Sequence, residues 1–379
     1  MSLNGALRIG KIAGIEIGVH WTWLIIFGLI TWSLAISFFP ETFPGWNPLW
    51  YWAIGAIAAV LLFVSVLVHE LAHSFVAKSR GLPVKSIVLF IFGGVSNIQK
   101  EAEHPQDEFW VTITGPLSSV GLGVLFLALY FLARGASSQV SALLVYLSSI
   151  NFLLAAFNLI PGFPLDGGRV FRAVLWWITG NFRQATRIAT IIGQGVAYLF
   201  IFGGLALIFT GQFLSGVWLI FIGWFLNGAA DQGYRQVVIQ DRLRGVKVAD
   251  MMNPEPVTVS PEMTLRELVD NYLLRRNVRD VPVIDDDNLV GMVTLEEVKD
   301  VPTERWDTTI VRDVMTRRED VKTITPRDDL AAAMRELGDE EIGQLPVVDR
   351  GRLVGLLSRA NLLRYLQLRE QLGTPPAQA

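Results

Sequence analysis

Two histidines and a glutamate stand close together in SVLVHELAHSFVAKSR, residues 65–80. His69 and His73 are four residues apart, so on a helix they share one face and can bind a single metal ion. Glu70 lies next to the open position of such an ion, where a general base is needed. Zinc is the ion that this H-E-x-x-H spacing typically holds. The pattern therefore predicts hydrolysis assisted by one zinc ion.

The setting of these residues strengthens that prediction. An uncharged run from Thr42 to Val68 leads directly into them. Ionisable side chains within a membrane helix are costly, and by default they mark a functional site. The alternative is a pair of histidines hydrogen-bonded inside a helical bundle. That alternative leaves Glu70 buried without a cation, which desolvation disfavours.

A catalytic zinc usually takes a third protein ligand as well as a water molecule. His20 lies between apolar and tryptophan residues at the start of an apolar run, and His104 lies in the charged stretch EAEHPQDE, so neither is a good candidate. Asp166, in NLIPGFPLDGGR, follows a Pro-Gly-Phe-Pro break that can fold its segment back toward the histidines. An aspartate before two glycines can equally be a turn or helix-cap residue. From the residues alone, the two interpretations of Asp166 are balanced.

Composition divides the chain into two parts. Of its 379 residues, 51% are hydrophobic and 18% charged, against about 25% charged in an average soluble domain. The charge is concentrated after residue 230, so we expect a membrane domain over 1–230, a linker over 231–246, a cytoplasmic α/β module over 247–370 and a flexible tail over 371–379. The net charge of -3 gives no indication of nucleic-acid binding, and the absence of cysteine excludes disulfides and thiolate zinc sites.

Six segments are long and apolar enough to cross a bilayer, which takes about 20 residues of helix. We expect a multi-pass α-helical membrane protein with spans near 18–39, 51–77, 109–133, 138–160, 188–209 and 213–229. Lys and Arg set the orientation. The loops assigned to the outside contain only Arg134, whereas the other side has ten such residues: Arg8, Lys11, Lys78, Arg80, Lys85, Lys100, Arg169, Arg172, Arg183 and Arg187. Both termini are therefore expected in the cytoplasm, and the cell membrane of a prokaryote is the expected location.

The run SIVLFIFGGVSNIQ, residues 86–99, is apolar but too short to cross. Its β-branched and aromatic residues, with Gly93 and Gly94 at the centre, predict a β-hairpin or re-entrant loop. Such backbone is tolerated at membrane depth only where it is buried in protein or lines a wet cavity. A plain cytoplasmic loop is the alternative.

Several stretches, in order, resemble the site-2 protease family of intramembrane zinc metalloproteases. They are HELAH at 69–73, FGGV at 92–95, TGPLSS at 114–119 and NLIPGFPLDGGR at 158–169. The resemblance implies that His69, His73 and Asp166 bind zinc and that Glu70 is the general base. It also implies that Asn158 helps to hold the substrate carbonyl or its oxyanion, and that Gly93 and Gly94 belong to a hairpin that clamps the substrate as an added strand.

That family cleaves membrane-spanning segments of regulatory proteins, often after another protease has trimmed them. A transmembrane protein substrate and the lipid bilayer are therefore the expected partners. Nothing of the size of a PDZ domain separates the expected spans, so selection of substrates by such a domain is not expected here.

The charged part of the chain repeats itself. VPVIDDDNLVGMVTLEEV at 281–298 aligns with LPVVDRGRLVGLLSRANL at 345–362, so that Pro282 and Gly291 recur as Pro346 and Gly355. The pattern resembles a tandem pair of CBS domains, which implies a disc-shaped module that often forms homodimers and often binds ATP, ADP or AMP. Candidate nucleotide contacts are Thr294, Glu297, Ser358 and Asn361. Because Glu297 and Asn361 stand where the family has aspartate, a purely structural or dimerising module is the alternative.

Two other functions are weighed against an intramembrane endopeptidase tuned by its CBS pair. A channel or transporter with a CBS tail is disfavoured because no line of charges or pair of broken helices marks a permeation path. An inactive homologue is disfavoured because both histidines, Glu70 and Asp166 are all present.

Overall fold

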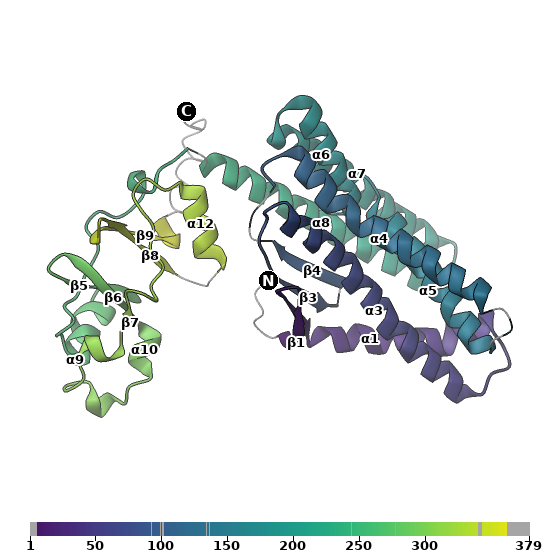
Figure 1. Ribbon diagram of the computed structural model, residues 1–379, viewed down its shortest axis with the longest axis horizontal. Helices are drawn as coiled ribbons and strands as arrows, with labels where there is room; N and C mark the ends of the chain where they lie inside the picture. The colour runs from purple at the N-terminus through teal and green to yellow at the C-terminus, as the bar shows by residue number, and fades with distance from the viewer. Residues whose placement is uncertain are drawn as a thin grey trace. The chain divides into compact units, whose positions relative to one another are not determined.

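The structure is a computed structural model that describes residues 6–91, 93–98, 100, 102–133, 135, 137–243, 245–276, 278–339 and 343–361 (Figure 1). The chain forms two compact units, one up to Val237 and one from Val238. Arg134 and the predicted tail 371–379 lie outside the described residues.

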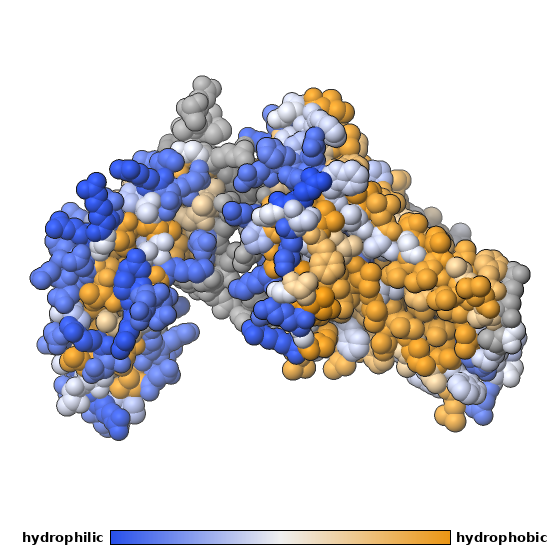
Figure 2. Space-filling model, viewed as in Figure 1, coloured by the Kyte–Doolittle hydropathy of each residue, from blue (hydrophilic) through white to orange (hydrophobic). Residues whose placement is uncertain are grey.

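Long helices make up most of the first unit. They are α1 (Thr22–Ser33), continued by a π-helical turn (Leu34–Phe38) and α2 (Phe39–Thr42), then α3 (Pro48–Ser79), α4 (Pro105–Leu132), α5 (Ser138–Asn158), α6 (Asp166–Thr179), α7 (Phe182–Phe209) and α8 (Phe213–Leu243). Within the described residues, six helical segments are long and apolar enough to cross a membrane, namely the α1–α2 segment, α3, α4, α5, α7 and α8 up to Val238. The prediction of six such helices is confirmed, and Figure 2 shows that the visible sides of several are covered by hydrophobic residues.

Four strands form a sheet beside these helices, in the order β1 (Ala6–Ile12), β2 (Ile15–His20), β3 (Val84–Phe90) and β4 (Gly93–Ile98). The first span begins at Thr22 rather than near residue 18, because residues 15–20 pair with β3 as a parallel strand. Strands β3 and β4 form the antiparallel hairpin that the composition predicted, with Phe90 opposite Gly93. Whether this hairpin enters a membrane stays a prediction.

A shared hydrophobic core holds the sheet against the part of α3 that carries the histidines. Ile15 and Ile17 of β2 and Ile87 of β3 are buried together with Leu71 and Ala77 of α3. Full burial of an isoleucine or leucine side chain contributes roughly 1.5–3 kcal/mol. The sheet is therefore fixed next to residues 69–73.

The second unit contains two copies of one fold. Its sheet has the order β5 (Asp280–Asp285), β6 (Asn288–Thr294), β9 (Arg352–Ser358) and β8 (Gln344–Asp349), with β7 (Thr316–Arg317) on β6. The register repeats between the copies, because Val283 faces Gly291 as Val347 faces Gly355. Each copy has its own hydrophobic core. The helices are α9 (Leu265–Leu268), α10 (Leu295–Lys299), α11 (Val311–Val314) and α12 (Leu330–Asp339), with a π-helical segment (Val269–Leu274) and 3₁₀ turns (Val248–Asp250 and Thr303–Arg305).

Candidate metal centre

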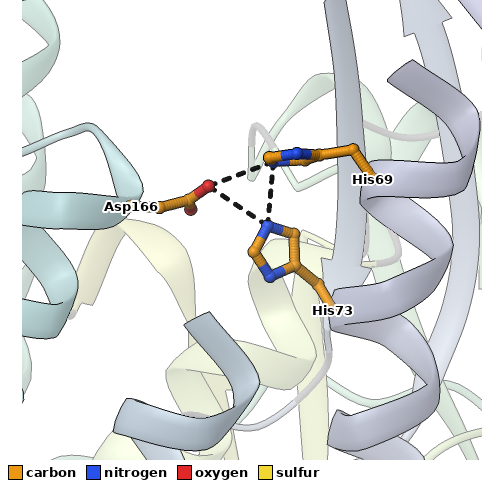
Figure 3. Close-up of side chains that lie close together, drawn as sticks. All are labelled: His69, His73 and Asp166. Atoms are coloured by element: carbon orange, nitrogen blue, oxygen red, sulfur yellow. Dashed lines mark hydrogen bonds and ion pairs between the residues drawn. The ribbon is translucent and has the colours of Figure 1, made fainter. Parts of the chain in front are cut away.

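Three side chains converge between α3 and the first residue of α6 (Figure 3). The Oδ2 atom of Asp166 lies 3.1 Å from Nε2 of His69 and 3.2 Å from Nε2 of His73. The two Nε2 atoms are 3.2 Å apart. All three potential ligand atoms lie within 4.8 Å of one another. Asp166, which the sequence left balanced between a ligand and a turn residue, is therefore next to both histidines.

Helix α4 orients both imidazole rings through their other nitrogen. Nδ1 of His73 donates to the backbone carbonyl of Val111 over 2.7 Å, and Nδ1 of His69 is 2.9 Å from Oγ of Ser119. Partners of this kind fix the tautomer and the orientation of metal-binding histidines. Both Nε2 atoms are left to face each other and Asp166. When a ring is neutral and carries its proton on Nδ1, its Nε2 atom has a lone pair, and two such nitrogens suit a shared cation.

Gly115 of α4 makes room for this arrangement. A Cβ atom at this position would lie 2.1 Å from Nε2 of His73 and 2.7 Å from Nε2 of His69. The ligand-facing edges of the rings therefore lie against bare backbone. Two nitrogens and one carboxylate oxygen, with a glycine beside them, fit a zinc site that keeps one position open for substrate or water.

Asp166 presents an ionised carboxylate to the histidines. Burial by itself raises the pKa of this carboxyl group, but hydrogen bonds with His69 and His73 lower it more, so that the pKa falls below its usual range. The side chain is 13% exposed. A deprotonated oxygen is the form that binds a metal ion.

Glu70 lies against strand β4. Its Oε2 accepts a hydrogen bond from Oγ of Ser96 over 2.6 Å. A Cβ atom at Gly94 would approach Cγ of Glu70 to 2.5 Å, so the strand can pass this close only with glycine there. Gly93 has a positive φ of 120°, which an L side chain rarely adopts. The general-base candidate and the predicted substrate-clamping strand are therefore neighbours.

Asn158 is the last residue of α5, and its side chain is turned toward its own helix. Nδ2 donates to the carbonyl of Leu154 over 3.0 Å. A role in holding an oxyanion would require the amide to leave that bond. This role stays a prediction.

The four candidate nucleotide contacts lie at equivalent ends of the two CBS copies. Oε2 of Glu297 accepts from the backbone N–H of Thr294 over 2.6 Å, and its Oε1 accepts from the hydroxyl of Thr316. Both carboxylate oxygens are thus already hydrogen-bonded. In the second copy, the backbone N–H of Asn361 donates to Oγ of Ser358 over 3.1 Å.

The sequence did not single out the residues that support the centre. Val111 acts through its backbone carbonyl, for which no residue type is diagnostic. Gly115 and Ser119 lie in the TGPLSS stretch, where their spacing of four residues on a helix could have indicated one shared face. Ser96 follows the glycine pair closely, and its contact with Glu70 depends on strand pairing that the sequence does not specify.

Both parts of the chain are similar to known proteins. Residues 57–137 and 132–202 match the model of peptidase family M50, and residues 248–303 and 311–368 match the CBS domain. The Mycobacterium tuberculosis protein named "Putative zinc metalloprotease Rip3" is 36% identical over 97% of this chain and 94% of its own length. Zinc metalloprotease MJ0392 of Methanocaldococcus jannaschii is 32% identical over 98% of this chain and 99% of its own.

Among solved structures, the site-2 protease from Methanocaldococcus jannaschii is 32% identical, with a TM-score of 0.42 over 60% of this chain and 94% of that one. Family M50 membership implies zinc. The chain thus belongs to peptidase family M50, as a membrane metalloprotease with a C-terminal pair of CBS domains.

Proposed function

We propose that this protein is a zinc-dependent endopeptidase that hydrolyses peptide bonds within membrane-spanning segments of other proteins. The observation that carries the proposal is the convergence of His69, His73 and Asp166 with Glu70 beside them, at the membrane-helix segment 69–73. His69, His73 and Asp166 would hold one zinc ion per chain. When bound, zinc supplies Lewis-acid chemistry, which polarises a carbonyl and makes water more acidic.

Glu70 moves the proton in this mechanism. As general base it takes a proton from the attacking water, and it then delivers that proton to the leaving amine nitrogen. The hydroxyl of Ser96 holds one carboxylate oxygen, which limits the rotamers of Glu70. Holding the carboxylate in place raises the rate, because proton transfer requires the base to lie within hydrogen-bond distance of the proton that it takes.

Strand β4 would bind the substrate backbone. It lies at the edge of the four-stranded sheet, where an extended peptide can pair as an additional strand. A transmembrane helix must first unwind at the cleavage point, because its amides are otherwise bonded within the helix. Gly93 and Gly94 let this edge pass next to Glu70, so the paired peptide would lie near the base.

Asn158 would donate a hydrogen bond to the developing oxyanion. Losing such a donor typically lowers turnover by about 10²–10³. The amide first has to exchange its bond to Leu154 for the substrate.

We place both termini, and with them the CBS pair, on the cytoplasmic side of a prokaryotic membrane. The bias of Lys and Arg toward one set of loops supports this orientation. A homodimer formed through the CBS domains is a further part of the proposal, and analytical ultracentrifugation of the purified chain tests it. A monomer at all concentrations would contradict it.

We propose in addition that an adenine nucleotide binds the CBS pair and tunes the protease. The repeated strand register and the hydroxyls of Thr294 and Ser358 support this proposal. Calorimetry on the detergent-purified full-length chain should show heat on addition of AMP or ATP. The Thr294→Ala/Ser358→Ala variant should show less. No heat at millimolar nucleotide would indicate a structural module.

The catalytic proposal is tested with Glu70→Gln. Glutamine keeps the size and one oxygen that accepts from Ser96, but it cannot accept a proton. We expect wild-type zinc content and a loss of turnover of about 10²–10⁴, the usual contribution of general acid–base catalysis. Cleavage is measured on a membrane-spanning reporter in vesicles. Wild-type turnover by the variant would remove Glu70 from its role.

The same assay separates the other candidate functions. An inactive homologue would bind zinc in the wild type without cleaving any transmembrane reporter. A channel or transporter would move ions or solutes across sealed vesicles, and that activity would survive removal of the metal.

A further inference from the structure

A buried ion pair joins the helix that orients the histidines to the helix that begins with Asp166. Glu108 of α4 is 2% exposed and Arg172 of α6 is 7% exposed. Nε of Arg172 donates to Oε1 of Glu108 over 2.8 Å, and Nη2 donates to the same oxygen. Nε of Arg169 lies 4.0 Å from that oxygen. Charges buried this deeply are tolerated only when they are paired, so each partner fixes the place of the other.

The guanidinium of Arg172 also makes cation–π contacts with two aromatic rings. Its Cζ atom lies 5.2 Å from the ring centre of Phe163 and 4.8 Å from that of Phe182. Phe163 belongs to the loop just before Asp166, and Phe182 is the first residue of α7. Arg172 therefore connects the Asp166 loop, α6 and α7 to one point on α4.

That point lies close to the groups that orient the histidines. Glu108 is one helical turn before Val111, whose carbonyl accepts from His73, and two turns before Gly115. Helix α4 thus contacts the histidine pair directly and contacts the Asp166 segment through Glu108. Since Asp166 comes from a different element than the histidines, its distance to them depends on how α6 is held against α4.

We propose that the Glu108–Arg172 ion pair is a positioning device that sets the place of Asp166 relative to the two histidines and thereby sets the affinity for zinc. This inference rests on the proposed metal site. Among the described residues, the ion pairs and cation–π contacts of Glu108 and Arg172 are with each other, with Arg169 and with aromatic rings, so both are positioning residues.

The test removes the pair as a unit. In Glu108→Leu/Arg172→Met, apolar side chains replace both charges, an exchange that often leaves stability unchanged, whereas loss of one partner leaves a buried unpaired charge. Zinc affinity is measured by chelator competition on the purified full-length chain, together with the melting temperature of the metal-free protein. We expect zinc binding to weaken about 10–100-fold, as when groups supporting metal ligands are lost, with an unchanged melting temperature.

The matched control is Asp107→Leu/Arg80→Met. This pair also involves the first turn of α4, with Arg80 Nη1 2.7 Å from Asp107 Oδ1, but it is partly exposed and joins α4 to the residue that follows α3. Exposed ion pairs contribute little to the stability of a fold, so zinc affinity in this control should stay within about twofold of wild type.

Arg172→Lys provides a second test that keeps Glu108 paired with a cation. Lysine lacks the planar fork and its stacking on aromatic rings, so we expect an intermediate loss of zinc affinity. Wild-type affinity in Arg172→Lys and in a folded double variant would overturn the inference. Zinc binding by the wild type would then still stand, whereas a wild type without zinc would instead contradict the proposed function.

Discussion

Gly115 shows, at the scale of single residues, how closely α4 approaches the proposed metal centre. A methyl group there would overlap the Nε2 atoms of both histidines. We predict that Gly115→Ala forces the rings apart and weakens zinc binding at least about tenfold, the lower end of losses seen when supporting groups are removed. Zinc content after dialysis against a chelator gives the result.

Gly121→Ala is the control for this prediction. Gly121 lies on the same helix, but a Cβ atom there would have nothing within 4 Å. Alanine is favoured over glycine in a helix by about 1 kcal/mol, so this variant should be as stable as wild type or more so, with full zinc content. Equal zinc content in the two variants would mean that the rings do not depend on the glycine.

Residue types predicted the local part of the site and left the rest open. His69, Glu70 and His73 follow from helical spacing, which is a property of one element. Asp166 could not be decided from its own segment, because its contact with the histidines depends on how α6 packs against α4, which in turn packs against α3. The bonds of Asn158 to Leu154 and of Glu297 to Thr316 were likewise outside what residue types specify.

At the scale of elements, the hairpin β3–β4 was predicted from its β-branched residues and glycines, whereas β1 and β2 were not. Residues 15–20 lie next to an apolar run, and hydropathy alone does not separate them from that run. The strand is distinguished from the helix that follows by its antiparallel pairing with β1 and its parallel pairing with β3. The pairing with β3 joins segments far apart in sequence, and it has no local signal.

Asp280, the first residue of β5, gives a pH prediction at this scale. Burial, together with repulsion from Glu297 and Glu296, raises the pKa of this carboxyl group. The folded state therefore disfavours the charged form, and the stability that the neutral group provides is lost as pH rises through the raised pKa. We predict that Asp280→Asn makes the second unit more stable at pH 7.

This gain should fade as the pH approaches the ordinary aspartate value of about 3.9, where Asp280 itself becomes neutral. Hydrogen exchange of residues 280–294 in the full-length chain, compared with wild type at each pH, measures the effect. Asp285→Asn, at the exposed end of the same strand, is the control and should show no gain. A gain that persists at low pH would rule out the burial of charge as its cause.

At the scale of the whole molecule, long uncharged runs were enough to predict six long apolar helices. The internal repeat, through its resemblance to a known family, predicted the CBS pair. The central claim about this protein is that three residues from two elements hold one zinc ion.

That claim is tested most directly by elemental analysis of the detergent-purified wild type beside His69→Ala and Asp166→Ala, which needs no known substrate. We predict about one zinc per chain in the wild type, as for a mononuclear catalytic site, and loss of zinc in both variants. Wild-type zinc content in Asp166→Ala would assign the third ligand elsewhere. A wild type that takes up no zinc, even when zinc is supplied, would contradict the account.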